Sequence, residues 1–199
     1  MADRRSWKTG ANKERDVMDD IVKQAMAKWP NVPDCYGWLG LDSRGHWHMR
    51  DDRVQGLGLF QSEVPGAKGS LLTHEKLVAF IHRNYAADEK GQWFFQNGPQ
   101  RVYVELELTP YVWRLDDDYT PIAQTGEMTL VRACLMDEVG RVYLETDLGL
   151  GLVHSMDVGQ VADALEQGRW KLVDCESKDL PNQYGFVVSP QFMDKANKA

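Results

Sequence analysis

Two histidines and two aspartates are the residues best spaced to bind a metal ion. His46 and His48 lie two positions apart in a segment predicted to be a strand, so both imidazoles should face the same side of it. Asp51 and Asp52 follow closely and could add oxygen ligands. This pattern is compatible with a small metal-dependent hydrolase. A solvent-facing pair is the more common arrangement, because no third histidine is placed by the sequence.

Two glutamates on another predicted strand could act as a catalytic acid and base. Glu105 and Glu107 share one strand face, with Cβ atoms about 7 Å apart. Strand alternation alone produces the same pattern, since exposed strand faces commonly carry Glu and Arg in cross-strand pairs. Structural pairing is therefore the preferred interpretation of these two residues.

A glycine-rich approach to a predicted helix is a third candidate, in this case for an anion. Gly149 and Gly151 lead to a helix that should start near Asp157, with His154 and Ser155 beside it. The carboxylate of Asp157 would already place a negative charge where an anion would bind. A lone GxG string is also a weak signal.

No established catalytic motif is present in the sequence. G-x-S-x-G, Walker, GxGxxG and HExxH strings are all absent. Cys35, Cys134 and Cys175 are far apart, without CxxC spacing, and should be reduced thiols rather than disulfides or zinc ligands. We therefore expect no cofactor, and favour a binding protein over an enzyme.

The aromatic residues give the strongest functional signal. Many large rings fall in or near predicted strands of the central stretch 91–115, more than one sheet face easily buries. Some of them should line a groove or interface, although a bulky core is the alternative interpretation. The residues expected to form an exposed ligand- or partner-binding face are Gln96, Asn97, Arg101, Tyr103 and Trp113.

This expected face depends on a strand over residues 101–108. Apolar residues occupy every second position and should face the core, so Arg101, Tyr103, Glu105 and Glu107 should face solvent. The ring of Tyr103 is accordingly expected to be accessible. Asn97-Gly98 favours a turn that folds residues 92–96 back along this strand.

Hydrophobic periodicity predicts the elements that carry these residues. Helical spacing of apolar residues is found in segments 14–28, 73–88 and 157–167. Hairpins are predicted at 36–49 and 127–146, a long loop at 50–70, and a last short strand at 186–188. We expect an α+β fold in which an antiparallel sheet is covered by two or three helices.

Two parts of the chain resemble each other. A D-x-x-G hairpin, a helix and a G-x-W string occur in the same order within residues 36–108 and 130–188. The order suggests two similar ββαβ halves that arose by duplication, with Trp93 and Trp170 in equivalent strands. The alternative is chance, since hairpins and helices are common.

Composition bounds the class of protein. The chain has 199 residues, a formal net charge of −7 and 43% hydrophobic residues, so it can form an ordinary globular core. The acidic balance disfavours nucleic acid as a partner. No signal-peptide core and no run of about 18 apolar residues occurs, which disfavours a membrane partner and predicts a cytoplasmic protein. A protein or small-molecule partner and a homo-oligomer both remain open.

We expect one compact domain over residues 13–190, a flexible tail at 1–12 and a frayed tail at 191–199. The strings YGWLGLD, FFQNGPQRVYV and DLGLGLVHSMD resemble a family of uncharacterised, conserved bacterial proteins over most of residues 36–190. This resemblance implies no activity. It favours a bacterial cytosolic origin and a single compact unit.

Overall fold

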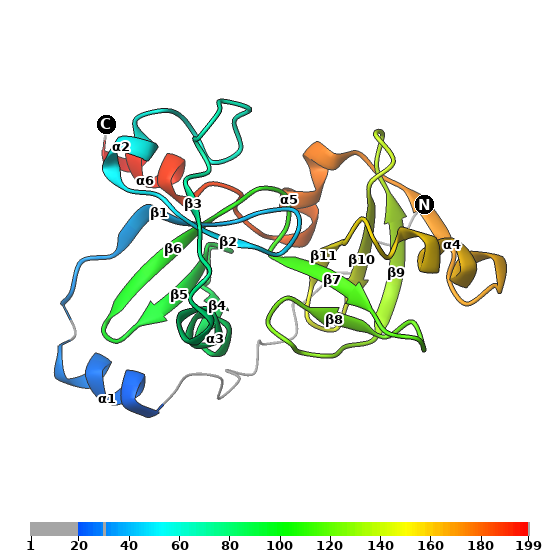
Figure 1. Ribbon diagram of the computed structural model, residues 1–199, viewed down its shortest axis with the longest axis horizontal. Coiled ribbons are helices and arrows are strands. Elements are labelled where there is room, and N and C mark those ends of the chain that lie inside the picture. The colour runs from blue at the N-terminus through cyan, green and yellow to red at the C-terminus, as the bar shows by residue number, and fades with distance from the viewer. Residues whose placement is uncertain (1–19, 30, 199) are drawn as a thin grey trace, which may run out of the picture.

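The computed structural model describes residues 20–29 and 31–198, and it has an α+β fold. Its strands form two six-stranded sheets that lie side by side, with helices around them (Figure 1). Each sheet contains both antiparallel and parallel pairs, so the expected single antiparallel sheet is wrong. The expected tail at 1–12 and the start of the expected helix at 14–28 lie outside the described residues.

The first sheet, which we name sheet A, has the strand order β3-β2-β1-β6-β5-β4. Only the β1–β6 pair in this sheet is parallel. The expected hairpins at 36–49 and 92–108 are both present, the second one turning at Asn97-Gly98. The strands are β1 (Cys35–Leu41), β2 (Trp47–Met49), β3 (Ser70–Leu71), β4 (Tyr85–Ala87), β5 (Trp93–Asn97) and β6 (Gln100–Leu106).

The second sheet, sheet B, has the order β12-β9-β10-β11-β7-β8. β11 pairs with β7 and β12 with β9 in parallel, and the other pairs are antiparallel. The strands are β7 (Tyr111–Leu115), β8 (Pro121–Ala123), β9 (Val131–Met136), β10 (Val142–Thr146), β11 (Leu150–Val153) and β12 (Leu172–Asp174).

Helices cover both faces of sheet A. α3 (Glu75–Arg83) lies against one face, and α2 (Asp52–Gln55) and α6 (Pro190–Lys198) lie on the other (Figure 1). The remaining helices are α1 (Asp20–Lys28), α4 (Val158–Glu166), α5 (Leu180–Tyr184) and the short 3₁₀ turn η1 (Ser177–Asp179). Three helices of the structure, α1, α3 and α4, fall within the segments expected to be helical from periodicity.

Two expectations for the C-terminal part are wrong. Residues 186–188 are not a strand, and α6 occupies the place of a frayed tail. The reason is tertiary, because the buried carboxylate of Glu105 accepts hydrogen bonds from the Ser189 hydroxyl (2.5 Å) and the Gln191 amide (2.9 Å) at the start of α6. Such a partner from a distant strand leaves no trace in local periodicity.

Four hairpins close with the same turn, which we call the aspartate turn. Its first residue accepts, at Oδ1, the backbone N–H groups two and four positions further on, and its fourth residue has a positive φ. The fourth residue is glycine in three of the turns and Tyr119 in the other. The four turns begin at Asp42, Asp88, Asp116 and Asp137.

The two similar halves are not confirmed by the strand connections. Trp93 is the first residue of β5, whereas Trp170 precedes β12 and lies outside any strand, so the two G-x-W strings do not mark equivalent strands. One feature is shared by the hairpins that turn at Asp42 and Asp137, because the first strand of each pairs in parallel with a later strand, β1 with β6 and β9 with β12.

Replacing a glycine by alanine should have opposite effects on stability at Gly140, in the aspartate turn between β9 and β10, and at Gly159, in α4. Gly140 has φ +83° and Gly159 lies in α4, and a Cβ would meet no atom within 4 Å at either. Gly140→Ala should lower the free energy of unfolding by about 1 kcal/mol, because a Cβ disfavours positive φ. Gly159→Ala should raise it by about 0.5 kcal/mol. Urea unfolding measures both, and a change of the same sign in the two variants would contradict this account.

Candidate functional site

The residues expected to form one exposed binding face do not do so. Gln96, Tyr103 and Trp113 have exposed fractions of 1%, 3% and 0%, and Trp113 belongs to sheet B whereas the others belong to sheet A. Arg101 is half-buried, and Asn97 is exposed. The alternation of β6 was predicted correctly, but the face that carries Tyr103 and Glu105 is covered as well, since α6 packs on β1 and β6.

Tyr103 lies inside an aromatic stack instead of facing solvent. Its ring is parallel to that of Tyr36, with centroids 4.5 Å apart, and edge-on to Phe94 at 5.8 Å. Its hydroxyl donates a hydrogen bond to Asp88 Oδ2 (3.2 Å). Arg101 places its guanidinium over the ring of Phe94, at 4.6 Å from the centroid. These contacts are those of a structural tyrosine.

The two glutamates of the β6 segment are bound by the protein itself. Glu105 holds the start of α6, and burial raises its pKa although the hydrogen bonds from Ser189 and Gln191 act to lower it. Glu107 accepts from the Ser43 amide (2.8 Å) and pairs with Lys68 (2.7 Å). Both carboxylates thus have structural partners, but Glu105 is buried against the start of α6 and does not form the exposed cross-strand pair expected from strand alternation.

His46 and His48 converge on one carboxylate. His48 Nε2 lies 3.0 Å from Asp42 Oδ2, and His46 Nδ1 lies 3.4 Å from the same oxygen. Asp51 is used elsewhere, because its Oδ1 caps α2 by accepting from the Val54 amide (2.8 Å). Within residues 20–29 and 31–198, no group of three or more His, Cys, Asp or Glu side chains is arranged to hold a metal ion.

The segment leading to α4 is built around an ion pair. Asp157 accepts two hydrogen bonds from Arg114 (2.6 and 3.2 Å) and one from the Leu115 amide (3.0 Å). Burial raises the pKa of Asp157, but these hydrogen bonds and the charge of Arg114 outweigh it, so the pKa is lower than usual. Gly151 serves packing, since a Cβ there would lie 2.4 Å from Nε1 of Trp113. The carboxylate therefore pairs with Arg114 and the Leu115 amide, and it makes no hydrogen bond to the first amides of α4.

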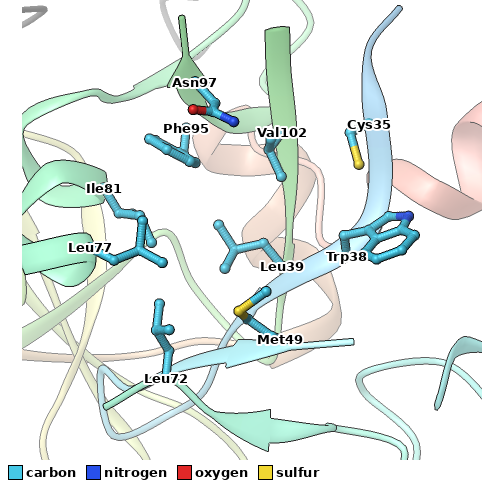
Figure 2. Close-up of a pocket in the computed structure, with 10 residues that line it drawn as sticks. All are labelled: Cys35, Trp38, Leu39, Met49, Leu72, Leu77, Ile81, Phe95, Asn97 and Val102. Atoms are coloured by element: carbon cyan, nitrogen blue, oxygen red, sulfur yellow. The ribbon is translucent and has the colours of Figure 1, made fainter. Parts of the chain in front are cut away.

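A pocket lies between sheet A and α3, and we name it the α3 pocket. Its volume is about 230 Å³. Leu77 and Ile81 project from successive turns of α3 towards Leu39 and Phe95 of the sheet (Figure 2). The full lining consists of Cys35, Trp38, Leu39, Met49, Leu72, Leu77, Ile81, Phe95, Asn97 and Val102.

The floor of the α3 pocket is buried and apolar. Leu39, Ile81 and Phe95 are all buried. Phe95 also packs edge-on against Phe80 of α3, with ring centroids 5.5 Å apart, which holds the helix on the sheet. The rim is different, because Met49 and Asn97 are exposed. Figure 2 shows the Trp38 ring on the far side of β1 from Leu39.

Sequence reasoning identified only one residue of this pocket as functional. Asn97 was included in the expected binding face. Trp38 and Phe95 belong to the aromatic residues of which some were expected to line a groove, with a bulky core as the alternative. Leu77 and Ile81 did appear as part of the apolar stripe of α3. Periodicity shows which face of a helix packs on the sheet, but it does not show whether a cavity is left between that face and the sheet.

Tyr103 provides the first test of the corrected strand faces. Tyr103→Ala should lower the free energy of unfolding by about 3–5 kcal/mol, because a buried aromatic ring is lost. Tyr103→Phe is the matched control and should cost about 1 kcal/mol, since it keeps the ring and removes the hydroxyl that bonds to Asp88. Urea unfolding measures both values. A cost below about 1 kcal/mol for Tyr103→Ala would show that the ring is accessible after all.

The pH dependence of stability tests the structural role of the Asp42 carboxylate. Burial acts to raise its pKa, but hydrogen bonds from His48 and from the His46 and Arg44 amides lower it from 3.8 to about 2. A depressed pKa contributes stability above pH ~4 that is lost as the pH falls towards ~2. Asp42→Asn should therefore cost about 2 kcal/mol at neutral pH, at ~1.4 kcal/mol per pKa unit.

The readout is urea unfolding of wild type and Asp42→Asn at several pH values. The difference between them should shrink between pH ~4 and pH ~2. Asp118→Asn, at an exposed position of another aspartate turn, is the control and should change stability little. A difference between wild type and Asp42→Asn that is the same at all pH values would contradict the role assigned to the carboxylate.

Comparison with known proteins gives the family but no activity. No curated protein matches the chain. A crystal structure of a DUF1285 family protein from Silicibacter pomeroyi DSS-3 is similar with a TM-score of 0.44 and 12% identity, over 67% of this chain and 72% of that one. Within the described residues, no helix is long and apolar enough to cross a membrane. The family described as "Protein of unknown function (DUF2946)" matches residues 18–191, and the chain belongs to that family.

Proposed function

We propose that this protein is a binding module that takes a small molecule into the α3 pocket. The observation that supports this proposal is the pocket itself, a concave and largely apolar site between sheet A and α3 with one exposed amide at its rim. Ligand sites typically combine an apolar wall with a few polar groups that fix orientation. The α3 pocket has this composition.

The size of the pocket also supports a ligand. Protein interiors are close-packed and contain few voids larger than a water molecule. An engineered apolar cavity of about 150 Å³ is large enough to bind benzene. The 230 Å³ of the α3 pocket should by proportion accept a molecule of about nine non-hydrogen atoms.

This proposal keeps the binding class expected from the sequence but moves the site. Of the five residues expected to bind, Asn97 alone lines the pocket. The metal-dependent hydrolase is less well supported, because no group of three or more His, Cys, Asp or Glu side chains in the described part of the chain is arranged to hold a metal ion. From composition and sequence order alone, we also propose a cytoplasmic location, one compact domain over residues 13–190, and two halves related by duplication.

A larger side chain on α3 that fills the pocket tests whether the pocket binds a small molecule. Toluene should bind the wild-type protein and shift the methyl NMR signals of Leu39 and Ile81, which form the floor. Leu77→Phe places a larger side chain in the pocket and should weaken toluene binding at least ~10-fold, with the thermal unfolding temperature preserved because the ring fills open space.

Ala79→Phe is the matched control for this experiment. It introduces the same side chain on the exposed face of α3, so toluene should bind as it does to wild type. Failure of toluene to shift the floor signals in wild type would refute the proposed site. Equal binding by wild type and the correctly folded Leu77→Phe variant would also refute it.

A further inference from the structure

The α3 pocket has a polar end and an apolar end. Figure 2 shows Asn97 and Cys35 at one end, Met49 and Leu72 at the other, and Leu39 between them. The floor and the second end offer only hydrocarbon and thioether groups to a ligand. A molecule in this pocket therefore meets hydrogen-bonding groups on one side only, which sets its orientation.

The Asn97 amide is available to bind. A side-chain amide has an N–H₂ donor and a carbonyl acceptor. Among the described residues, none forms a hydrogen bond with this amide, and the side chain is exposed at the end of β5. The group that satisfies both halves of an amide is another amide, or a similar group with a donor and an acceptor side by side.

The residues that line the polar end include no charged side chain. Among the lining residues, none is Lys, Arg, His, Asp or Glu. Cys35 remains a neutral thiol, because burial, followed by the charge of Asp52, raises its pKa. A charged ligand would lose hydration on entering such a site and gain no counter-charge. Neutral ligands are therefore favoured over ions of the same size.

From this asymmetry, and resting on the proposed function, we infer that the ligand is an uncharged molecule with an amide-like head and an apolar body. It has about nine non-hydrogen atoms in total. Its head pairs with Asn97, and its apolar body lies on Leu39, Ile81 and Phe95.

Four probes with the same ring test this inference: toluene, benzamide, benzoate and benzylammonium. Their dissociation constants are measured by NMR titration of the full chain. Benzamide should bind about fivefold tighter than toluene, the contribution of a neutral hydrogen bond. Benzoate and benzylammonium should bind at least ~10-fold more weakly than benzamide because each must lose its hydration shell.

Two substitutions of the exposed Asn97 complete the experiment. Asn97→Ala should reduce benzamide binding to the level of toluene while leaving toluene binding within about twofold of wild type. Asn97→Asp places a negative charge at the polar end and should make benzylammonium the preferred probe. Because Asn97 is exposed, both variants should fold, which a circular dichroism spectrum checks.

The outcomes separate this inference from the proposed function. If toluene and benzamide bind equally and Asn97→Ala changes neither, the amide-like head is refuted while the pocket remains a binding site. Tightest binding by benzoate or benzylammonium in wild type would refute the uncharged class. If none of the four probes binds, the proposed function and the inference fail together.

Discussion

A continuous line of aromatic rings joins the two sheets, and the rest of the structure depends on it. Trp47, Tyr85 and Trp93 of sheet A follow one another at centroid distances of 5.3 and 4.7 Å. Trp93 then meets Tyr111 of sheet B at 5.1 Å, and Tyr111 stacks on Trp113 at 5.0 Å. Trp93 packs against the buried cores of both sheets. Large rings bury the most surface per residue, so this line lets two sheets share one interior.

Local features of the fold could be predicted from the sequence, whereas the covering of its faces could not. The Asn97-Gly98 turn and the helical stripe of α3 are encoded within a few residues. Tyr103 is covered by the ring of Tyr36 from β1, and Glu105 is covered by α6, which begins more than eighty residues later. Alternation in a strand separates two faces, but it does not tell which of them another element covers.

The same limit explains why the candidate site was largely missed. The α3 pocket is lined by Leu77 and Ile81 of α3 on one side and by Leu39 of β1 on the other. All three are ordinary core residues by type and spacing, and only the three-dimensional packing distinguishes a filled interface from a hollow one. Asn97 could be singled out because a polar residue beside a turn is a visible exception in an aromatic strand.

The aspartate turns have a consequence for the order in which the chain folds. Each turn is stabilised by hydrogen bonds within five consecutive residues, so four hairpins can begin to form without help from the rest of the protein. The parallel pairs are different, since β1 must find β6 across a separation of 65 residues between Leu41 and Leu106. Closing so long a loop costs entropy before any contact is gained. We therefore expect hairpins to form early and the joining of β1 to β6 to set the folding rate.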